Sequence, residues 1–277
     1  MEPGIYPNLS HADYHALTDI ISNSYLGRLN QCPANAKVPV TETTAMSFGR
    51  ALHSYVLDGQ DVFDKEYAIA PTVNKRTKDG REVYEAFCED AEEHHKSIID
   101  FPDYEKIMLM HKAIMSHPLA SVLLKEGRSE TSIFWTDEKT KLPCKCRPDR
   151  IPEGDHGVIL DLKSARSAEL RDFTNDCIRF GYARQAGIYI EGFNSISSAK
   201  VDAFVFICIE KDEPYRIEVF TLDDNFIFYG QSEFHRLLKI EKECRAKKVW
   251  PNYKNTEIRT LYLPNWTLIE MGEGDNA

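Results

Sequence analysis

The sequence lacks the marks of membrane, secreted and repeat proteins. No apolar run is long enough to cross a bilayer, and the segment Met1–Tyr6 does not begin a signal peptide. The 277 residues contain no internal repeat and no low-complexity segment. A chain of this length, with 42% hydrophobic and 28% charged residues, is typical of a globular protein with a sizeable core. We therefore expect one domain over 1–277 and no membrane contact.

No C-x-x-C pair occurs among the seven cysteines, which are scattered and odd in number. This pattern favours free thiols in a reducing compartment over disulfides or a zinc site, so we expect a cytoplasmic protein. Cys144 and Cys146 are two residues apart, and side chains at this spacing share one face of a strand. That placement favours core packing for both thiols.

Positive charge is scarce, because the sequence has 34 Lys and Arg but 44 Asp and Glu, which gives a formal net charge of −10. Nucleic-acid-binding proteins usually carry a basic surface, so the balance counts against simple DNA binding. One basic stretch remains within the expected loop 71–81, where four Lys and Arg lie between Lys75 and Arg81. Phosphate contact and plain solvation explain this stretch equally well. Carboxylates that hold a metal would also contribute negative charge, which the ion neutralises.

Apolar periodicity predicts a mixed α/β (α+β) fold with a mostly helical part over 1–127. Helices are expected as two short segments within 7–30 and over 45–57, 82–99, 103–125, 167–179, 182–197 and 223–247. Strands are expected over 131–136, 142–150, 157–163, 200–210 and 215–222. The apolar run 200–210 predicts a central strand buried on both faces. A closing part, 223–277, should hold the last helix and an extended strap from Trp250 that packs on the body, with 272–277 disordered.

The stretch from Val158 to Ala165 places an acid and an amine two residues apart on an expected strand. Asp161 and Lys163 should point to one side, and Leu160 and Leu162 to the other. Burying a carboxylate and an ammonium group costs free energy unless they pair or bind a metal. The simpler interpretation is a partly buried ion pair, and for the D-x-K pattern alone we prefer it.

Metal-assisted phosphodiester hydrolysis is the chemistry that would need such a set together with Asp149, from the preceding expected strand. Two carboxylates suit Mg²⁺, which prefers oxygen ligands and activates water near a phosphoryl group. A lysine would orient the water or offset charge developing on the phosphate. Glu130 could add a carboxylate, although a solvated glutamate at a strand edge is more common.

Two expected helices carry further polar residues at regular spacing. His53 lies beside the apolar stripe of the helix 45–57, and Gly49, one turn earlier, leaves space beside the imidazole. A lone histidine at a core edge is more often bonded to a carbonyl than to a ligand. On the helix 182–197, Tyr182, Gln185 and Tyr189 share one face.

Gly-x-x-x-His on a helix, two acids and a lysine on strands, and Gln-x-x-x-Tyr on a helix follow one another here in a fixed order. In order and spacing they resemble the PD-(D/E)xK nuclease superfamily, in the branch of the RecB-like exonucleases. The resemblance implies the nuclease fold of that superfamily, a central mixed β-sheet flanked by helices, here with an N-terminal helical elaboration and catalytic elements over 128–222. Each motif is weak alone, and the order makes the set specific.

Further motifs resemble the C-terminal nuclease domain of the exonuclease VIII (RecE-type) family. These motifs are Met1–Tyr6, Asn74-x-Arg76-Thr77-x-x-Gly80, Cys144-x-Cys146-Arg147-Pro148-Asp149, Trp250-Pro251 and Leu263-Pro264-x-Trp266. That family implies 5′→3′ digestion of linear double-stranded DNA in a homotetrameric ring, with the 3′ strand passed to a RecT-type annealing protein. It also implies a phage or prophage origin in bacteria. Some members have a long N-terminal region that this sequence lacks, so we expect the nuclease unit alone.

On this resemblance, His53, Asp149 and Asp161 hold Mg²⁺, for which Mn²⁺ should substitute, and the backbone carbonyl of Leu162 is a fourth ligand. Lys163 corresponds to the catalytic lysine, acting with Asp149 and Asp161. The superfamily often has Glu where this chain has Asp161, which would draw the metal about one methylene nearer the strand.

The same resemblance matches Gln185 and Tyr189 to the motif that holds the scissile strand and the lysine. Tyr182, Ser164 and Arg76 complete the set of expected DNA contacts. Two alternatives stay open at this point: a DNA-end binding or interaction module on a nuclease fold, and an endonuclease or repair nuclease of the same superfamily.

Overall fold

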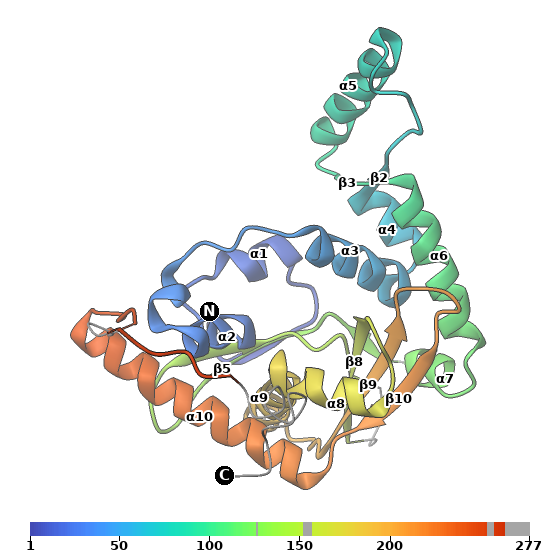
Figure 1. The fold of residues 1–277 in the computed structure, drawn as a ribbon. Coiled ribbons are helices and arrows are strands. Elements are labelled where there is room, and N and C mark those ends of the chain that lie inside the picture. Colours follow the sequence, from blue (N-terminus) through green and yellow to red (C-terminus); the bar gives the residue numbers. More distant parts are fainter. Residues whose placement is uncertain (126, 152–156, 254–257, 264–277) are drawn as a thin grey trace.

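A five-stranded mixed sheet lies at the centre of the computed structural model, which describes residues 1–125, 127–151, 157–253 and 258–263 (Figure 1). Its strands run in the order β10-β9-β8-β7-β4. Their bounds are Ile217–Thr221 (β10), Ala203–Glu210 (β9), Val158–Ala165 (β8), Arg150–Ile151 (β7) and Arg128–Ser129 (β4). β8 and β9 are parallel, so the chain needs a long crossover between them, which α8 (Leu170–Arg179) and α9 (Tyr182–Ile196) supply.

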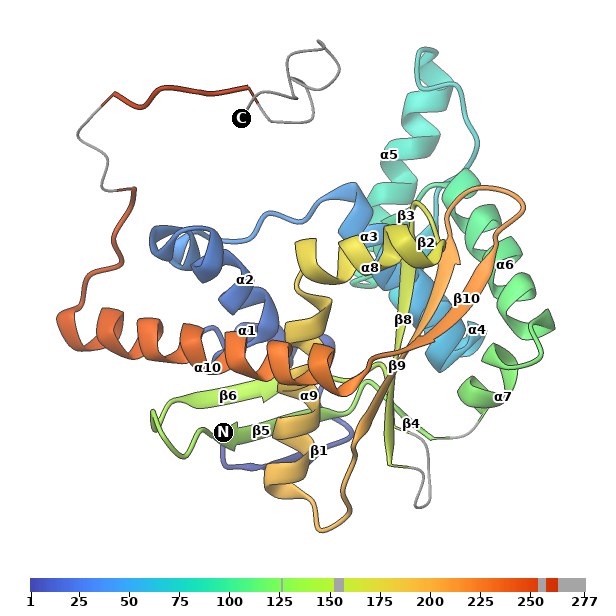
Figure 2. The same cartoon turned by 60° about the horizontal axis from the view of Figure 1, so that its bottom comes forward.

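The predicted central strand is confirmed, because β9 pairs with β8 on one side and with β10 on the other. Its apolar run is buried on both faces, since Phe204 and Phe206 point into one core cluster and Ile207 and Ile209 into another. The covering helices are α3 (Thr44–His53), α4 (Gln60–Glu66), α6 (Phe101–Ser116) and α7 (Ala120–Lys125) on one face, and α8, α9 and α10 (Asp224–Lys247) on the other (Figure 2).

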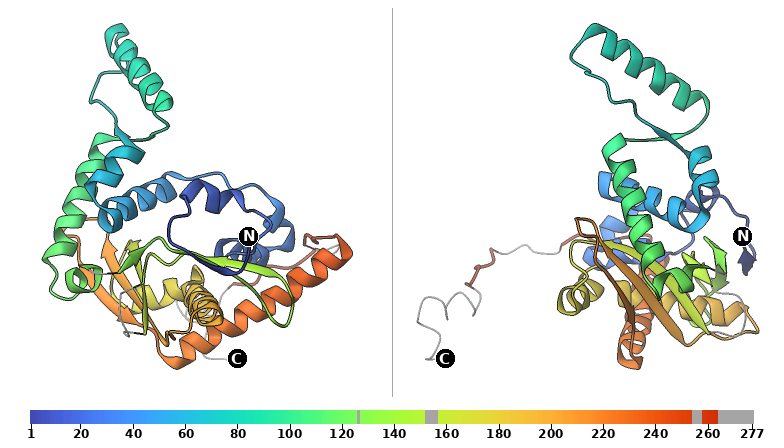
Figure 3. Two further views of the ribbon diagram at one scale, coloured as in Figure 1. Left: turned by 180° about the vertical axis from the view of Figure 1, so that it is seen from behind. Right: turned by 90° about the vertical axis from the view of Figure 1, so that its right-hand side faces the viewer.

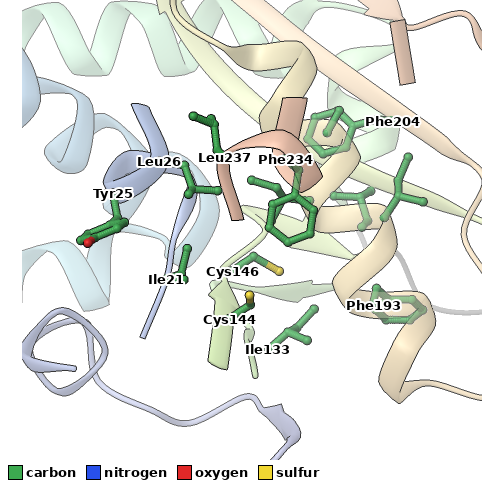
Figure 4. Packing of buried hydrophobic residues seen from close by; sticks show 14 of the residues in the cluster. Ile21, Tyr25, Leu26, Ile133, Cys144, Cys146, Phe193, Phe204, Phe234 and Leu237 are labelled. Atoms are coloured by element: carbon green, nitrogen blue, oxygen red, sulfur yellow. The ribbon is translucent and has the colours of Figure 1, made fainter. Parts of the chain in front are cut away.

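A second, antiparallel sheet of β1 (Gly4–Tyr6), β5 (Ser132–Thr136) and β6 (Pro143–Cys146) takes up the predicted hairpin. The expectation of one strand over 142–150 is wrong, because β6 ends at Cys146 and pairing resumes only at Arg150 in the other sheet. Pro148 explains the break, since proline cannot donate a ladder hydrogen bond. Cys144 and Cys146 are buried in the core between this sheet and the helices, as expected (Figure 4).

The predicted short amino-terminal helices are α1 (His11–Ala16) and α2 (Asn23–Gln31), and a 3-10 turn, η1 (Pro33–Lys37), follows. Their side chains Ser10 and Ser22 accept hydrogen bonds from the first helical turns, which satisfies donors that a helix start leaves unpaired. Leu26 and Leu29 of α2 pack into the same core cluster as α9 and α10.

An arm made of β2 (Tyr67–Ile69), α5 (Lys78–Glu93) and β3 (Ser97–Ile99) projects from the body (Figures 1 and 3). The expected loop 71–81 is corrected here, because α5 begins at Lys78, where the Thr77 hydroxyl accepts a hydrogen bond from the Gly80 amide at 3.1 Å. The expected helix 82–99 is also too long. It ends at Glu93, and 97–99 pairs with β2 as a parallel strand.

The tail after α10 packs only in part. Trp250 donates a hydrogen bond to Glu241, and the Lys37 ammonium lies 3.9 Å from the centroid of its indole ring. The expected strap is wrong for 258–263, whose Leu261 is 95% exposed, so no apolar surface holds it (Figure 2). Pro264, Trp266 and the segment 272–277 lie outside the described residues. None of the helices in the described ranges is both long enough and apolar enough to span a membrane.

Candidate active site

His53 ends α3 and faces the central sheet. The helix begins where Thr43 accepts a hydrogen bond from the Met46 amide, packs Leu52 into the core, and continues beyond His53 as one π-helical turn, η2 (Ser54–Asp58). Such turns inside helices occur frequently at functional sites. The His53 Nε2 atom lies 2.9 Å from the Leu162 carbonyl oxygen, and Nδ1 lies 3.5 Å from Asp149 Oδ2.

The partners of His53 restrict its proton. A carbonyl oxygen can only accept, so Nε2 carries the proton that it donates to Leu162. Nδ1 then faces the Asp149 carboxylate, which is also an acceptor. This arrangement is favourable only when positive charge lies between Nδ1 and the carboxylate, as a proton on the ring or as a cation.

Asp149 lies in the bend between β6 and β7, not on a strand as predicted. Its Oδ2 atom accepts a hydrogen bond of 2.7 Å from the backbone amide of Leu162, and the residue is 8% exposed. The bend therefore brings Asp149 against Leu162 of β8, the same residue whose carbonyl oxygen His53 contacts.

Asp161 and Lys163 lie side by side on β8, as alternation predicts, and their charged groups form a contact ion pair. Gln185 of α9 donates a hydrogen bond to the other oxygen, Asp161 Oδ1. Burial, followed by the charge of Asp149, raises the pKa of Asp161 to about 6. Burial opposes the charge of Lys163, but Asp161 and Asp149 outweigh it and raise the pKa of the amine.

Glu130 joins the group from the turn before β5, where it has a left-handed backbone with φ of 44°. Donor atoms of His53, Glu130 and Asp149 all lie within 4.8 Å of one another. Burial first, and then the charge of Asp149, raises the pKa of Glu130 well above its usual range. Two carboxylates beside one imidazole in a partly buried space would stabilise a bound cation.

The remaining predicted DNA contacts are placed differently. Tyr182 lies 4.8 Å from Lys163 Nζ, measured to the ring centroid, and so belongs to the site. Tyr189 packs on Phe204, and burial raises its pKa well above the usual value. Ser164 follows Lys163 on β8, and alternation points it to the opposite face. Arg76 precedes α5 on the projecting arm, so the structure does not bring it to the site (Figure 1).

Comparison with protein families gives one match over most of the chain. Residues 22–259 match the model described as a PDDEXK-like domain of unknown function (DUF3799). The chain belongs to this family. Its fold is therefore the PD-(D/E)xK nuclease fold, and the predicted resemblance to that superfamily is confirmed.

The chain also resembles solved structures, one of which shares its overall fold. A candidate exonuclease from Eubacterium rectale superposes with a TM-score of 0.57 at 16% identity, covering 93% of this chain and 96% of its own. An alkaline exonuclease from Laribacter hongkongensis gives a TM-score of 0.32 at 11% identity, with coverage of 86% and 97%. No curated protein matches the sequence.

The side chains present suit a divalent cation. Two of them carry carboxylates, Asp149 and Asp161, and the buried Asp161 Oδ2 accepts no hydrogen bond within the described residues, its close contact being Lys163. Oxygen donors with one imidazole are a set that Mg²⁺ and Mn²⁺ accept. When bound, such an ion supplies Lewis-acid activation of a phosphoryl oxygen and of an attacking water.

The structure also reveals contacts that the sequence did not predict. The amide of Leu162 orients Asp149, a backbone role that no side-chain pattern reports. A second group joins Asp137, Glu191 and His235, with His235 Nε2 at 3.0 Å from Glu191 Oε2. These three lie after β5, on α9 and on α10, so their meeting depends on the packing of α9 against α10.

Proposed function

We propose that this protein is a Mg²⁺-dependent exodeoxyribonuclease, a phosphodiester hydrolase of the 3.1.11 type, that degrades linear double-stranded DNA. One observation carries the proposal: His53 and Asp149 meet at Leu162, and the preceding residue of β8, Asp161, pairs with Lys163. Acids, an imidazole and a lysine held this way suit phosphodiester hydrolysis with a divalent ion. His53, Asp149, Asp161 and the Leu162 carbonyl would hold the ion, and Mn²⁺ would substitute for Mg²⁺.

The chain's own groups divide the remaining work. The Lys163 ammonium stays protonated beside Asp161, so it serves to orient the attacking water and to balance charge on the phosphate. Gln185 donates a hydrogen bond to Asp161 Oδ1, and so holds the carboxylate with Oδ2 directed away from the Gln185 amide. The Leu162 amide orients the Asp149 carboxylate by donating a hydrogen bond to Oδ2.

The finer points of the proposal come from the resemblance to exonuclease VIII. They are 5′→3′ polarity, 3′ single strands left for a RecT-type annealing protein, a homotetrameric ring, and a cytoplasmic, phage- or prophage-encoded origin. The seven free cysteines agree with a reducing compartment. We also propose that 1–277 is one domain, with a helical part over 1–127, a catalytic part over 128–222 and a closing part over 223–277.

Digestion of linear duplexes labelled at the 5′ or the 3′ end, with and without Mg²⁺, tests activity and polarity together. We expect Mg²⁺-dependent loss of the 5′ label first, with the 3′ strand persisting. A covalently closed plasmid should resist, because a ring that encloses DNA needs an end. Equal digestion of the closed plasmid would instead indicate an endonuclease.

Replacing Asp161 or Lys163 by alanine should lower cleavage by at least about a thousandfold, because each change removes charge that stabilises the transition state. The circular dichroism spectrum should stay that of the unchanged protein. Wild-type cleavage rates in either variant would contradict the assignment of the site.

A further inference from the structure

An aromatic path leads from the candidate site to solvent. Phe180 is the C-cap residue that follows α8, and 51% of the residue is exposed. Its ring centroid lies 5.8 Å from that of Tyr182, whose ring in turn lies 4.8 Å from Lys163 Nζ. Two successive ring contacts therefore connect the ammonium group of the site with an exposed flat surface.

The turn between α8 and α9 fixes this surface. Gly181 has φ of 72°, a left-handed conformation that suits glycine, and a Cβ there would lie 2.5 Å from Arg184 Nη2. Arg184 is buried and donates a hydrogen bond of 2.8 Å to Asn23. The close packing of Arg184 against Gly181 leaves no room for a side chain at 181. Phe180 is therefore presented next to a closely packed turn.

The path combines two cations with two aromatic rings, which suits a nucleobase next to a phosphate. The Arg179 guanidinium carbon lies 5.2 Å from the centre of the Phe180 ring, a cation placed where it can also stack on a base. Stacking on aromatic rings supplies much of the affinity of single-strand-binding proteins.

We propose that Phe180, together with Tyr182 and Arg179, stacks an unpaired nucleobase of the strand whose phosphate lies at Lys163. This inference rests on the proposed nuclease function and adds a specific subsite to it. An interior base of a duplex has stacked neighbours on both faces, so we expect the path to take the base at the strand end, once it has left its pair. The enzyme then acts best where the terminal base pair is open.

Binding without cleavage tests the subsite directly. The full chain is titrated, in EDTA, into a labelled single-stranded oligonucleotide of about 10 nucleotides, within the usual range of site sizes. Abasic versions carry one missing base at successive positions. For the unchanged protein, one abasic position should weaken binding about tenfold, the order of effect of one stacked base. Phe180→Ala should bind the intact oligonucleotide about tenfold more weakly than the unchanged protein does. Removing the base at the sensitive position should not weaken its binding further.

Variants at the same position separate stacking from simple apolar contact. Phe180→Trp should keep the affinity, whereas Phe180→Leu should behave like the alanine variant. Phe101→Ala is the matched control, because Phe101 is 41% exposed on α6 and has no place in the path. Thermal unfolding should be nearly unchanged in all of them.

Each outcome decides between explanations. Unchanged affinity in Phe180→Ala, or wild-type affinity in Phe180→Leu, would overturn the stacking subsite, and the second would indicate an apolar protein contact. In both cases Mg²⁺-dependent cleavage by the unchanged protein would leave the proposed function standing. Failure of the unchanged protein to bind or cleave any DNA would overturn both proposals. A further readout is kcat/KM, which Phe180→Ala should lower more on blunt than on pre-frayed duplexes.

Discussion

At the scale of single residues, one backbone amide and one carbonyl of Leu162 organise the candidate site. The amide donates to Asp149 and the carbonyl accepts from His53, so a loop residue and a helix residue are both aligned on β8. Asp161 and Lys163, on either side of Leu162, point to the face of β8 opposite to the Leu162 side chain. The strand therefore presents backbone ligands and side-chain charges within three consecutive residues.

The pKa of Asp161 should appear in the pH dependence of metal binding. Burial and the charge of Asp149 raise this pKa to about 6. Below this pH a proton competes with the cation for the carboxylate, and above it the carboxylate is deprotonated. We expect the Mn²⁺ dissociation constant to be nearly constant above pH 7 and to rise about tenfold per pH unit below 6. Isothermal titration calorimetry measures this.

His235→Gln is the control for that titration, because it alters the group formed with Asp137 and Glu191 and leaves the candidate site unchanged. The same pH profile in this variant would assign the metal to the site around Asp149. A profile lost in His235→Gln would assign it to the second group instead.

At the scale of elements, α9 and α10 cross at glycines and hold the wall of the site in place. A Cβ on Gly230 would lie 1.9 Å from the Ala183 carbonyl oxygen, so the two backbones are in direct contact. Gln185, which bonds Asp161, lies in the same turns of α9. The position of Gln185 therefore depends on this crossing.

Gly230→Ala should destabilise the fold, because the added methyl group overlaps backbone that cannot move alone. We expect a loss of about 1–3 kcal/mol in the free energy of unfolding, measured by urea denaturation. Gly49→Ala is the matched control in α3, where the added Cβ would meet no atom within 4 Å. There the better helix propensity of alanine should add about 0.5–1 kcal/mol. Equal effects of both changes would contradict the crossing as described.

At the scale of the whole molecule, the acidic balance leaves one short basic stretch, 75–81, on an arm whose helix α5 is otherwise acidic. The net charge is −10, yet Lys75 and Arg76 lie just before α5, and Lys78 and Arg81 lie in its first turn. The arm projects from the body, so these groups could reach DNA that extends beyond the site (Figure 3).

Arg76→Ala should weaken duplex binding and flatten its salt dependence. Each phosphate contact releases counterions, so the slope of log K against log salt should fall by about one unit. Fluorescence anisotropy at several salt concentrations measures this. Lys239→Ala, an exposed cation on α10, is the control and should keep the wild-type slope. An unchanged slope in Arg76→Ala would mean that the arm is only solvated.

Much of the architecture follows from local sequence patterns. Alternation and apolar runs determined β8, β9 and the hairpin, and capping serines and threonines marked where helices begin. The pairing of Asp161 with Lys163 follows from their spacing alone. Boundaries were missed where short-range signals conflicted. The arm is one example, because Thr77 starts a helix inside a stretch that reads as a loop.

Tertiary structure alone decided which distant groups meet. Asp149 reaches β8 because Pro148 ends one strand and the chain bends into another sheet, and His53 arrives from the opposite layer. A sequence specifies periodicity, which acts over a few residues, and so it determined the elements and their buried faces. Contacts such as His235 with Glu191, or the exposure of Phe180, depend on how whole elements pack, and no local pattern encodes that.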